Sequence, residues 1–260
     1  MRYGIIFLLL LSSPIFGDTF KKHGASFRVG PYPTAIVAGD LNGDTIPEII
    51  TTNRGHLSDP SGKIPAGDQL SFLVASKALA YEAHPQLRTG FGPYALVMAN
   101  IDALKAKDLV VVNFMATRNR DLTLLRNLGE NRFEPLNFGV DDEQLRYMQR
   151  EDSAGKPTFT TPGFTALAVD DFDGDGYRDV VATGWSSDII AYFPGVEAGY
   201  FATPILTTVS GSPRDIVIHD FNSDGKKDLA VALYRTHEIV LMEGMGGGKF
   251  REVNRFTSHG

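Results

Sequence analysis

Short apolar runs separated by polar loops are the dominant pattern of this sequence. Four segments share one design, an apolar run, a polar loop of nine residues and a second apolar run, at residues 35–53, 95–113, 166–184 and 215–233. The runs are rich in Val, Ile, Leu and Ala and too short for helices. They lack strict polar alternation, so both faces of each strand are expected to be covered. The pattern predicts an all-β repeat protein.

The spacing of the loops sets the size of the repeat. The loops begin at Asp40, Asn100, Asp171 and Asp220, which gives spacings of 60, 71 and 49 residues. A four-stranded propeller blade takes roughly 40–50 residues, and the longer spacings leave room for insertions. We predict a single β-propeller domain over residues 18–260, with repeat units near 27–88, 89–160, 161–210 and 211–257.

How the repeats close is left open by the sequence. Phe27–Val29 resembles an additional outer strand ahead of the first repeat, while the last repeat already has its own outer strand at Phe250–Val253. Sheet edges must be covered, or they pair with another chain. A four-bladed ring is the first interpretation. A five-bladed ring and an open array completed by dimerisation are the alternatives.

The first 17 residues have the features of a secretory signal peptide. A positive start at Arg2 precedes the apolar run Ile5–Leu11, and Gly17 follows a short break. The run is too short to span a bilayer core of roughly 30 Å. We therefore expect export to the periplasm, the cell surface or the medium, with no membrane span after cleavage. A retained anchor is the alternative.

Composition narrows the class of protein further. The net charge is −6, and Lys and Arg are scattered, which argues against a nucleic-acid partner. The sequence has no cysteine, so disulfides are excluded. An exported domain without disulfides needs a sizeable core, repetition or metal for its stability.

The third loop carries the clearest chemistry. Oxygen side chains occupy its positions one, three, five and nine, as Asp171, Asp173, Asp175 and Asp179, and the carbonyl of Tyr177 is a natural fifth donor. Converging carboxylates repel one another unless a cation lies among them. Hard oxygen ligands in this number suit calcium.

Two other loops repeat this ligand spacing. The predicted ligands are Asp40, Asn42, Asp44, the Ile46 carbonyl and Glu48 in the first loop, and Asp220, Asn222, Asp224, the Lys226 carbonyl and Asp228 in the fourth. The alternative is a set of Asx turns, in which Asp and Asn bond only their own backbone. Three loops with full ligand spacing favour about three calcium sites.

The second loop, Asn100–Asp108, departs from the pattern. Leu104 stands where the third ligand should be, and Lys105 and Lys107 lie beside it. We predict that this loop holds no ion and that an ammonium group supplies the positive charge.

The apolar strands, the DxDxDG-type loop and the following glycine turn resemble FG-GAP/VCBS repeats, related to those of integrin α-subunit propellers. The resemblance extends over about residues 27–253 and includes Gly30–Pro33 and Phe91–Tyr94 ahead of two inner strands. It implies a β-propeller with calcium in the loop between the first two strands of a blade. It also implies a ligand face at the opposite end, without naming a ligand.

One repeated position predicts that ligand face. The fifteenth residue counted from each loop start is Arg54, Phe114, Trp185 or Tyr234, and Tyr32 and Tyr94 precede two of the inner strands. Aromatic and arginine side chains in a ring suit a carbohydrate or a protein outside the cell. The alternative is that these side chains fill gaps between blades.

No catalytic motif is present in the sequence. There is no G-x-S-x-G elbow, no H-E-x-x-H pair, no phosphate loop and no cysteine nucleophile. The sequence therefore favours a binding or adhesion module in which calcium is structural. A calcium-dependent polysaccharide lyase or hydrolase on a propeller scaffold is the alternative.

Overall fold

The computed structural model describes residues 26–56, 66–77, 80–102, 104, 106–116, 119–141, 143–144 and 161–257. The predicted signal peptide, residues 1–17, lies outside these ranges. Within them the chain is built mainly from strands, with a short 3-10 helix (η1, Glu197–Gly199) and helical residues at 143–144. No helix in the described ranges is long and apolar enough to cross a membrane.

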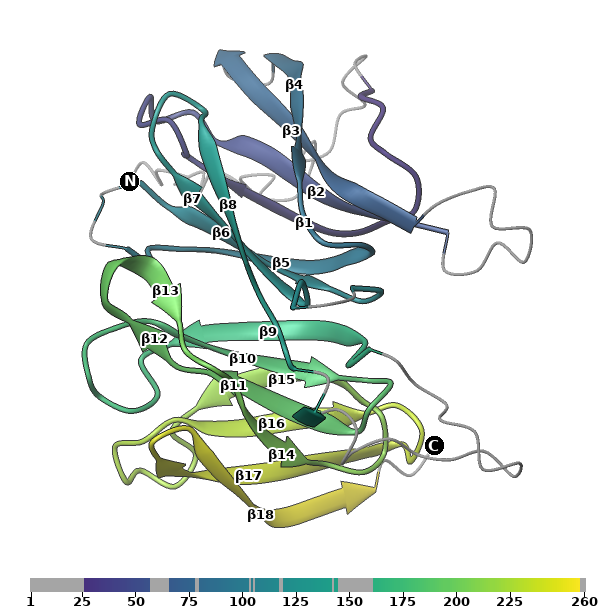
Figure 1. Ribbon diagram of the computed structural model, residues 1–260, viewed down its shortest axis with the longest axis vertical. Helices are drawn as coiled ribbons and strands as arrows, with labels where there is room; N and C mark the ends of the chain where they lie inside the picture. Colours follow the sequence, from purple (N-terminus) through teal and green to yellow (C-terminus); the bar gives the residue numbers. More distant parts are fainter. Residues whose placement is uncertain are drawn as a thin grey trace, which may run out of the picture.

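Four antiparallel sheets of four strands organise the chain (Figure 1). Each takes up one of the four predicted strand–loop–strand segments. Sheet 1 holds β1 (Pro33–Gly39), β2 (Glu48–Gly55), β3 (Ala66–Lys77) and β4 (Ala80–Arg88), and sheet 2 holds β5 (Pro93–Ala99), β6 (Asp108–Asn113), β7 (Leu122–Asn127) and β8 (Phe133–Phe138). Sheet 3 holds β9 (Phe164–Asp170), β10 (Asp179–Gly184), β11 (Ile189–Phe193) and β14 (Ile205–Thr208). Sheet 4 holds β15 (Pro213–His219), β16 (Asp228–Leu233), β17 (Glu238–Gly246) and β18 (Lys249–Thr257), and the short strands β12 (Gly195–Val196) and β13 (Tyr200–Phe201) pair apart from it.

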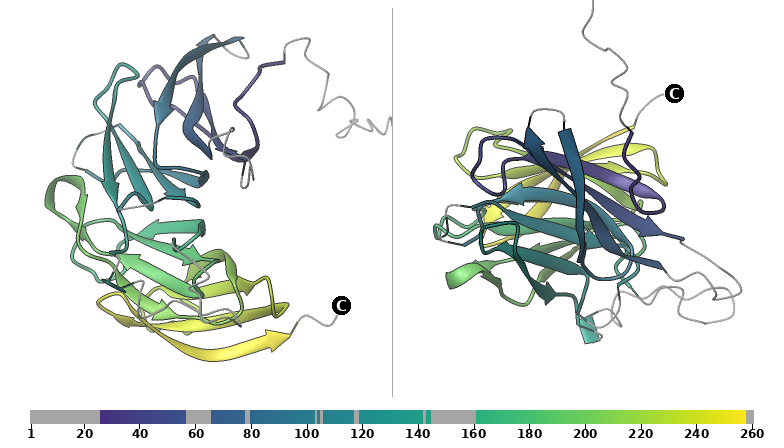
Figure 2. Two further views of the ribbon diagram at one scale, coloured as in Figure 1. Left: turned by 45° about the vertical axis from the view of Figure 1, so that its right-hand side comes forward. Right: turned by 90° about the horizontal axis from the view of Figure 1, so that it is seen from above.

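The sheets stand face to face along an arc, with sheet 1 and sheet 4 at its two ends (Figure 2). The first strands of successive sheets are in contact: β1 with β5, β5 with β9, and β9 with β15. Two of the junctions each contain an equivalent hydrogen bond between their inner strands. The Thr34 hydroxyl donates to the Tyr94 carbonyl at 2.7 Å, and the Thr165 hydroxyl donates to the Arg214 carbonyl at 2.9 Å. The predicted all-β, propeller-like architecture is confirmed.

An apolar cluster fills each junction between neighbouring sheets. Ile50, Leu70 and Phe72 of sheet 1 meet Leu109 and Leu125 of sheet 2. The second cluster joins sheets 2 and 3, and the third joins sheets 3 and 4. Sheets 2 and 3 are therefore covered on both faces, which explains why their middle strands β6, β7, β10 and β11 are buried along nearly their whole length.

The predicted additional strand at Phe27–Val29 is wrong. The structure assigns no strand to residues 26–30. The Phe27 ring lies edge-on to Tyr81 at 6.0 Å, and the Gly30 N–H donates to the Ser71 hydroxyl at 3.0 Å. This segment contacts side chains of sheet 1 instead of forming a ladder.

We expect the junctions to dominate stability, and two leucines of the second repeat test this. Leu122 is fully buried, whereas Leu128 is 45% exposed. Leu122→Ala should lower the free energy of unfolding by about 2–5 kcal/mol, because it opens a cavity between sheets 2 and 3. Leu128→Ala should cost less than about 1 kcal/mol. Urea denaturation measures both, and equal costs would show that the junction between the sheets is not tightly packed.

Candidate metal loops and ligand face

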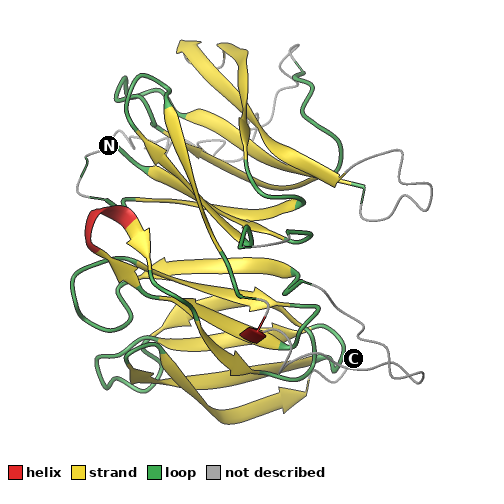
Figure 3. Ribbon diagram, in the orientation of Figure 1, coloured by secondary structure: helices red, strands yellow, loops and turns green. Residues whose placement is uncertain are grey.

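The nine-residue loops and the fifteenth-position residues lie at opposite ends of the sheets. Each loop joins the first strand of its sheet to the second, as between β1, which ends at Gly39, and β2, which begins at Glu48. Because these strands are antiparallel, Tyr32 and Arg54 lie at the other end of the same pair. The loops drawn green in Figure 3 therefore form two separate groups at the strand ends.

The third loop gathers carboxylates closely enough to share one cation. One oxygen from each of Asp171, Asp173 and Asp179 lies within 4.8 Å of the others. Oxygen-only donors on a loop of this size fit calcium. Asp175 and Tyr177 belong to the same loop, where the Tyr177 N–H donates to the Asp175 carboxylate at 2.8 Å.

Backbone donors hold the third loop in shape. The Asp171 carboxylate accepts N–H groups from Gly174 at 2.7 Å and from Gly176 at 3.0 Å. Both glycines have positive φ, 83° and 92°, a region that side chains disfavour. The predicted Asx turns are thus present, and they occur in the same loop as the clustered carboxylates.

The ninth-position acid is anchored from two sides. Asp179 accepts the Phe172 N–H at 2.8 Å from within the loop and the Gly195 N–H at 2.6 Å from beyond the third strand. Burial, with a further contribution from the charge of Asp173, raises the pKa of the Asp179 carboxyl. A cation among these carboxylates would offset both effects.

Tyr192 contacts the third loop, and the sequence analysis did not predict this contact. Its hydroxyl donates to Asp173 at 3.0 Å from strand β11. Burial and the charges of Asp179 and Asp173 raise the pKa of Tyr192, so it remains a donor. No repeated position pointed to it, because the equivalent residues Phe72, Leu124 and Leu241 are apolar.

The first loop has the same backbone design. The buried carboxylate of Glu48 accepts the Leu41 N–H at 2.8 Å, and the Asn42 amide donates to Asp44 and Glu48, both at 3.1 Å. Burial, followed by the charges of Asp44 and Asp40, raises the pKa of Glu48. The Ile46 N–H donates to Asp44 at 2.7 Å, which places the Ile46 carbonyl in the same turn.

The fourth loop repeats this arrangement. Asp228 accepts the Phe221 N–H at 2.9 Å and the Gly244 N–H at 2.8 Å, and Asp220 accepts the Gly225 N–H at 2.9 Å. The Asp224 N–H donates to the Asn222 side-chain oxygen at 2.9 Å. The Asp224 carboxylate accepts the Lys226 N–H at 2.9 Å and lies 3.6 Å from the Lys226 ammonium. Among the described residues, three carboxylates come within 4.8 Å only in the third loop, since the first and fourth have Asn at position three.

An arginine from the third strand pairs with an acidic side chain of the second loop. Arg126 of β7 lies 3.3 Å from the buried carboxylate of Asp102, and Asp108 accepts the Ile101 N–H at 3.0 Å. A guanidinium from the third strand thus pairs with this carboxylate, in the loop for which an ammonium group was predicted. Lys105 lies outside the described residues, and the Lys107 carbonyl accepts from Asn127.

At the opposite end, the predicted ligand-face residues form one continuous series, the aromatic–arginine ladder. Successive rings lie close together within sheet 2, from sheet 2 to sheet 3 and from sheet 3 to sheet 4: Tyr94 and Phe114 at 5.6 Å, Phe114 and Trp185 at 5.8 Å, and Trp185 and Tyr234 at 6.4 Å. The Arg54 guanidinium lies 5.9 Å from the ring centres of both Tyr32 and Tyr94. The ladder crosses all four sheets.

Arg214 joins the ladder, although it was not among the predicted residues. Its guanidinium lies 4.9 Å from the Tyr94 ring centre and donates to the Tyr94 hydroxyl. Arginine occurs only once at the position before each inner strand's apolar run, which holds Thr34, Tyr94, Thr165 and Arg214, so no repetition pointed to it. Arg54, Tyr94, Phe114, Trp185, Arg214 and Tyr234 together line one hollow of about 250 Å³.

The hollow is positively charged. Neither Arg54 nor Arg214 has an ion-pair partner in the described part of the chain, and Arg54 Nε is buried without a hydrogen-bond acceptor there. Arg235, which lines a second hollow beside Trp185 and Tyr234, is instead paired with Asp188 at 2.9 Å. Two unpaired guanidiniums beside aromatic rings favour an anionic ligand.

The ion pair between Arg126 of β7 and the second loop can be tested by mutation. Arg126→Gln leaves the buried Asp102 carboxylate without its counter-ion, so we expect a loss of about 2 kcal/mol in the free energy of unfolding. Arg132→Gln is the control, because Arg132 and its partner Glu130 are exposed and such pairs contribute less than about 1 kcal/mol. Urea denaturation in the presence of a chelator measures both. Equal effects would contradict a structural role for the Arg126 pair.

Comparisons with known proteins support the repeat assignment. Residues 171–231 match a family model described as FG-GAP-like repeat, so the resemblance predicted from the sequence is confirmed there. No curated protein matches the sequence. Two similar solved structures are BBS1N in complex with ARL6DN, at 14% identity and a TM-score of 0.53, and a protein from Lactobacillus plantarum, at 13% identity and a TM-score of 0.60.

Both alignments cover 89% of this chain, which spans 59% of the length of each of those chains. At these identities the likeness concerns the fold. Residues 171–231 therefore form an FG-GAP-like repeat within a propeller-like, all-β chain.

Proposed function

We propose that this chain is an exported binding module that takes a carboxylated glycan on its aromatic–arginine ladder, with calcium structural at the other end. The observation that carries the proposal is the continuity of the ladder over four sheets. The ladder lines a hollow with two guanidiniums that have no ion-pair partner among the described residues. Side chains that only filled gaps between sheets would be expected to be apolar or to have their charges paired. Export rests on the signal-peptide features of residues 1–17.

The chemistry of the ladder supports a sugar chain with carboxylates. Tyr, Trp and Phe offer flat apolar faces on which sugar rings can lie, and tyrosine hydroxyls add polar contacts. Arg54 and Arg214 offer planar donors that match a carboxylate. A protein partner is the alternative ligand, since the similar BBS1N structure is a complex with ARL6DN.

Calcium in the first, third and fourth loops would stabilise the strand pairs that carry the ladder. Asp171, Asp173 and Asp179 fit a divalent cation by their spacing. Extracellular calcium modules bind at about 10⁻⁴ to 10⁻³ M. At tenfold excess over such a constant, each site adds about 1.4 kcal/mol to the free energy of unfolding.

The four sheets are proposed as the blades of the module. Each sheet repeats the same order from inner to outer strand, as propeller blades do. The fifth blade considered from the sequence has no support in the described residues, since Phe27–Val29 forms no strand.

Removal of calcium should lower the thermal midpoint by about 8–16 °C. Three sites at tenfold excess contribute about 4 kcal/mol, and 1 kcal/mol corresponds to about 2–4 °C for a chain of this size. Asp173→Ala should lose part of the calcium-dependent shift, whereas Glu130→Ala, at a side chain that is 86% exposed, should keep it. Differential scanning calorimetry with calcium or chelator measures this. An unchanged midpoint would contradict calcium binding.

The ladder should discriminate between charged and neutral forms of one sugar. A trisaccharide of galacturonic acid should bind in isothermal titration calorimetry, and its methyl ester, which keeps the rings but removes the charge, should bind at least about tenfold more weakly. Arg214→Ala and Trp185→Ala should each weaken binding by about tenfold or more. Tyr200→Ala is the control, because Tyr200 is exposed outside the ladder. Equal binding of acid and ester would contradict the proposed ligand class.

A polysaccharide lyase is the second candidate function. The contact between the Arg214 guanidinium and the Tyr94 hydroxyl favours it, since a lyase needs a carboxylate neutraliser beside a proton-transferring group. Incubation with polygalacturonate and calcium would then produce unsaturated ends that absorb in the ultraviolet, and Tyr94→Phe would abolish them. Binding without such product identifies the binding module.

A further inference from the structure

The aromatic–arginine ladder borders a second hollow beside the one that contains Arg54 and Arg214. Trp185 and Tyr234 line both hollows, so the two are adjacent. Their volumes are similar, about 250 Å³ for the first hollow and about 240 Å³ for the second. Arg235 is among the other residues that line the second hollow. A sugar chain that lies across the two shared rings would therefore place neighbouring sugars in neighbouring hollows.

The positive charge of the second hollow is balanced within the protein. The Arg235 guanidinium lies 2.9 Å from one carboxylate oxygen of Asp188, and the other oxygen accepts the Ser212 N–H at 2.8 Å. The side chain of Asp188 is 4% exposed, whereas that of Arg235 is 50% exposed. Donors of the protein itself thus hold the Asp188 carboxylate in place, and its negative charge is present whether or not a ligand is bound.

The first hollow has a different electrostatic character. In the part of the chain that the structure describes, neither Arg54 nor Arg214 is paired with a carboxylate, and the buried Arg54 Nε has no acceptor. A guanidinium without a counter-ion binds a ligand carboxylate strongly. In the second hollow a ligand carboxylate would instead meet an arginine that is already paired, and it would be repelled by the charge of Asp188.

The remaining side chains of the second hollow suit a neutral sugar. The hydroxyls of Ser186 and Tyr234 can each donate and accept a hydrogen bond, as sugar hydroxyls do. The rings of Trp185 and Tyr234 lie 6.4 Å apart at an angle of 61°, and Tyr234 is 64% exposed. Their apolar faces can therefore contact a sugar ring without any charge on that sugar.

We propose, on the basis of the glycan-binding function proposed above, that the ladder selects a glycan in which a carboxylated sugar lies next to a neutral sugar. The carboxylated sugar occupies the first hollow and the neutral sugar the second. A chain with a carboxylate on every sugar binds less tightly. Asp188 determines this specificity, because its charge acts against a second carboxylate and does not contribute to binding the first.

Four forms of one disaccharide of galacturonic acid test this selection on the full chain: the diacid, the two methyl monoesters and the methyl diester. In isothermal titration calorimetry, one monoester should bind about threefold to fivefold more tightly than the diacid, which is the scale of one exposed ion pair. The diester should bind most weakly.

The outcomes separate this selection from the function on which it rests. A diacid that binds at least as tightly as both monoesters, with the diester weaker, would overturn the selection and leave the proposed function intact. Equal binding of all four forms, or binding of none, would overturn the proposed function and the selection with it.

Two variants of the Asp188–Arg235 pair should shift the preference in opposite directions. Asp188→Asn keeps an acceptor for the Ser212 N–H and suits the positive φ of 56° at this position. It leaves the Arg235 guanidinium unpaired, so binding of the diacid should become about threefold to fivefold tighter relative to the monoester. Arg235→Gln leaves the Asp188 carboxylate unpaired, so binding of the diacid should become weaker relative to the monoester.

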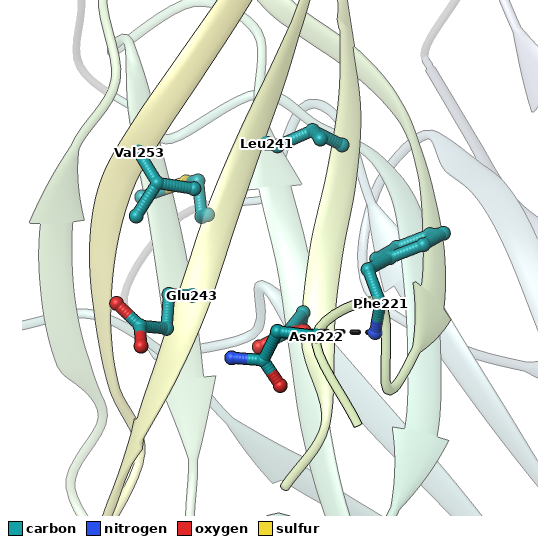
Figure 4. Close-up of a pocket in the computed structure, with 7 residues that line it drawn as sticks. Phe221, Asn222, Leu241, Glu243 and Val253 are labelled. Atoms are coloured by element: carbon teal, nitrogen blue, oxygen red, sulfur yellow. Dashed lines mark hydrogen bonds between the residues drawn. The ribbon is translucent and has the colours of Figure 1, made fainter. Parts of the chain in front are cut away.

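Glu243→Gln is the matched control for these variants. Glu243 also pairs with an arginine, Arg251, but it lies in a different hollow beside Asn222 of the fourth loop, at the opposite end of the sheets from the ladder (Figure 4). It should leave the preference unchanged. Unchanged circular dichroism would show that all three variants fold. If Asp188→Asn and Arg235→Gln changed the binding of every form by the same factor, the pair would have only a structural role and the selection would be overturned.

Discussion

The burial of inner strands between neighbouring sheets is the constraint on which the rest of this structure depends. Val110, Leu122 and Leu124 are fully buried at one junction, and equivalent residues recur at the others. Because every sheet enters the arc in the same orientation, every nine-residue loop is placed at one end and every fifteenth residue at the other. The separation between the end with the candidate metal loops and the end with the aromatic–arginine ladder follows from this repetition alone.

The ninth-position acid links the loops to this framework. In all four loops it accepts the N–H of position two, and in three of them it also accepts an N–H at the end of the third strand, from Asn127, Gly195 or Gly244. The second loop keeps both bonds although Leu104 replaces a ligand and Arg126 pairs with Asp102. The acid therefore keeps the same two backbone hydrogen bonds in a loop that lacks the full ligand set, so its structural role does not depend on that set.

Much of this arrangement could be predicted from the sequence because it is repeated. Four recurrences of one loop gave the strand pairs, the candidate ligands and the series from Arg54 to Tyr234, and the structure brings the ladder residues together. The features that the sequence missed occur in one repeat only. Arg214, Tyr192 and Arg126 each contact their partners across strands or sheets, so no local spacing signals them. The segment at Phe27 has a strand-like composition but contacts side chains of sheet 1, which only the tertiary structure reveals.

Anomalous diffraction from a crystal grown in millimolar calcium tests most directly which of the four loops bind calcium. We expect one peak in each of the first, third and fourth loops, within about 2.3–2.6 Å of the carboxylate oxygens, and no peak beside Asp102, where Arg126 already supplies the charge. Empty loops at Asp171, Asp173 and Asp179, or a calcium ion in the second loop, would contradict it.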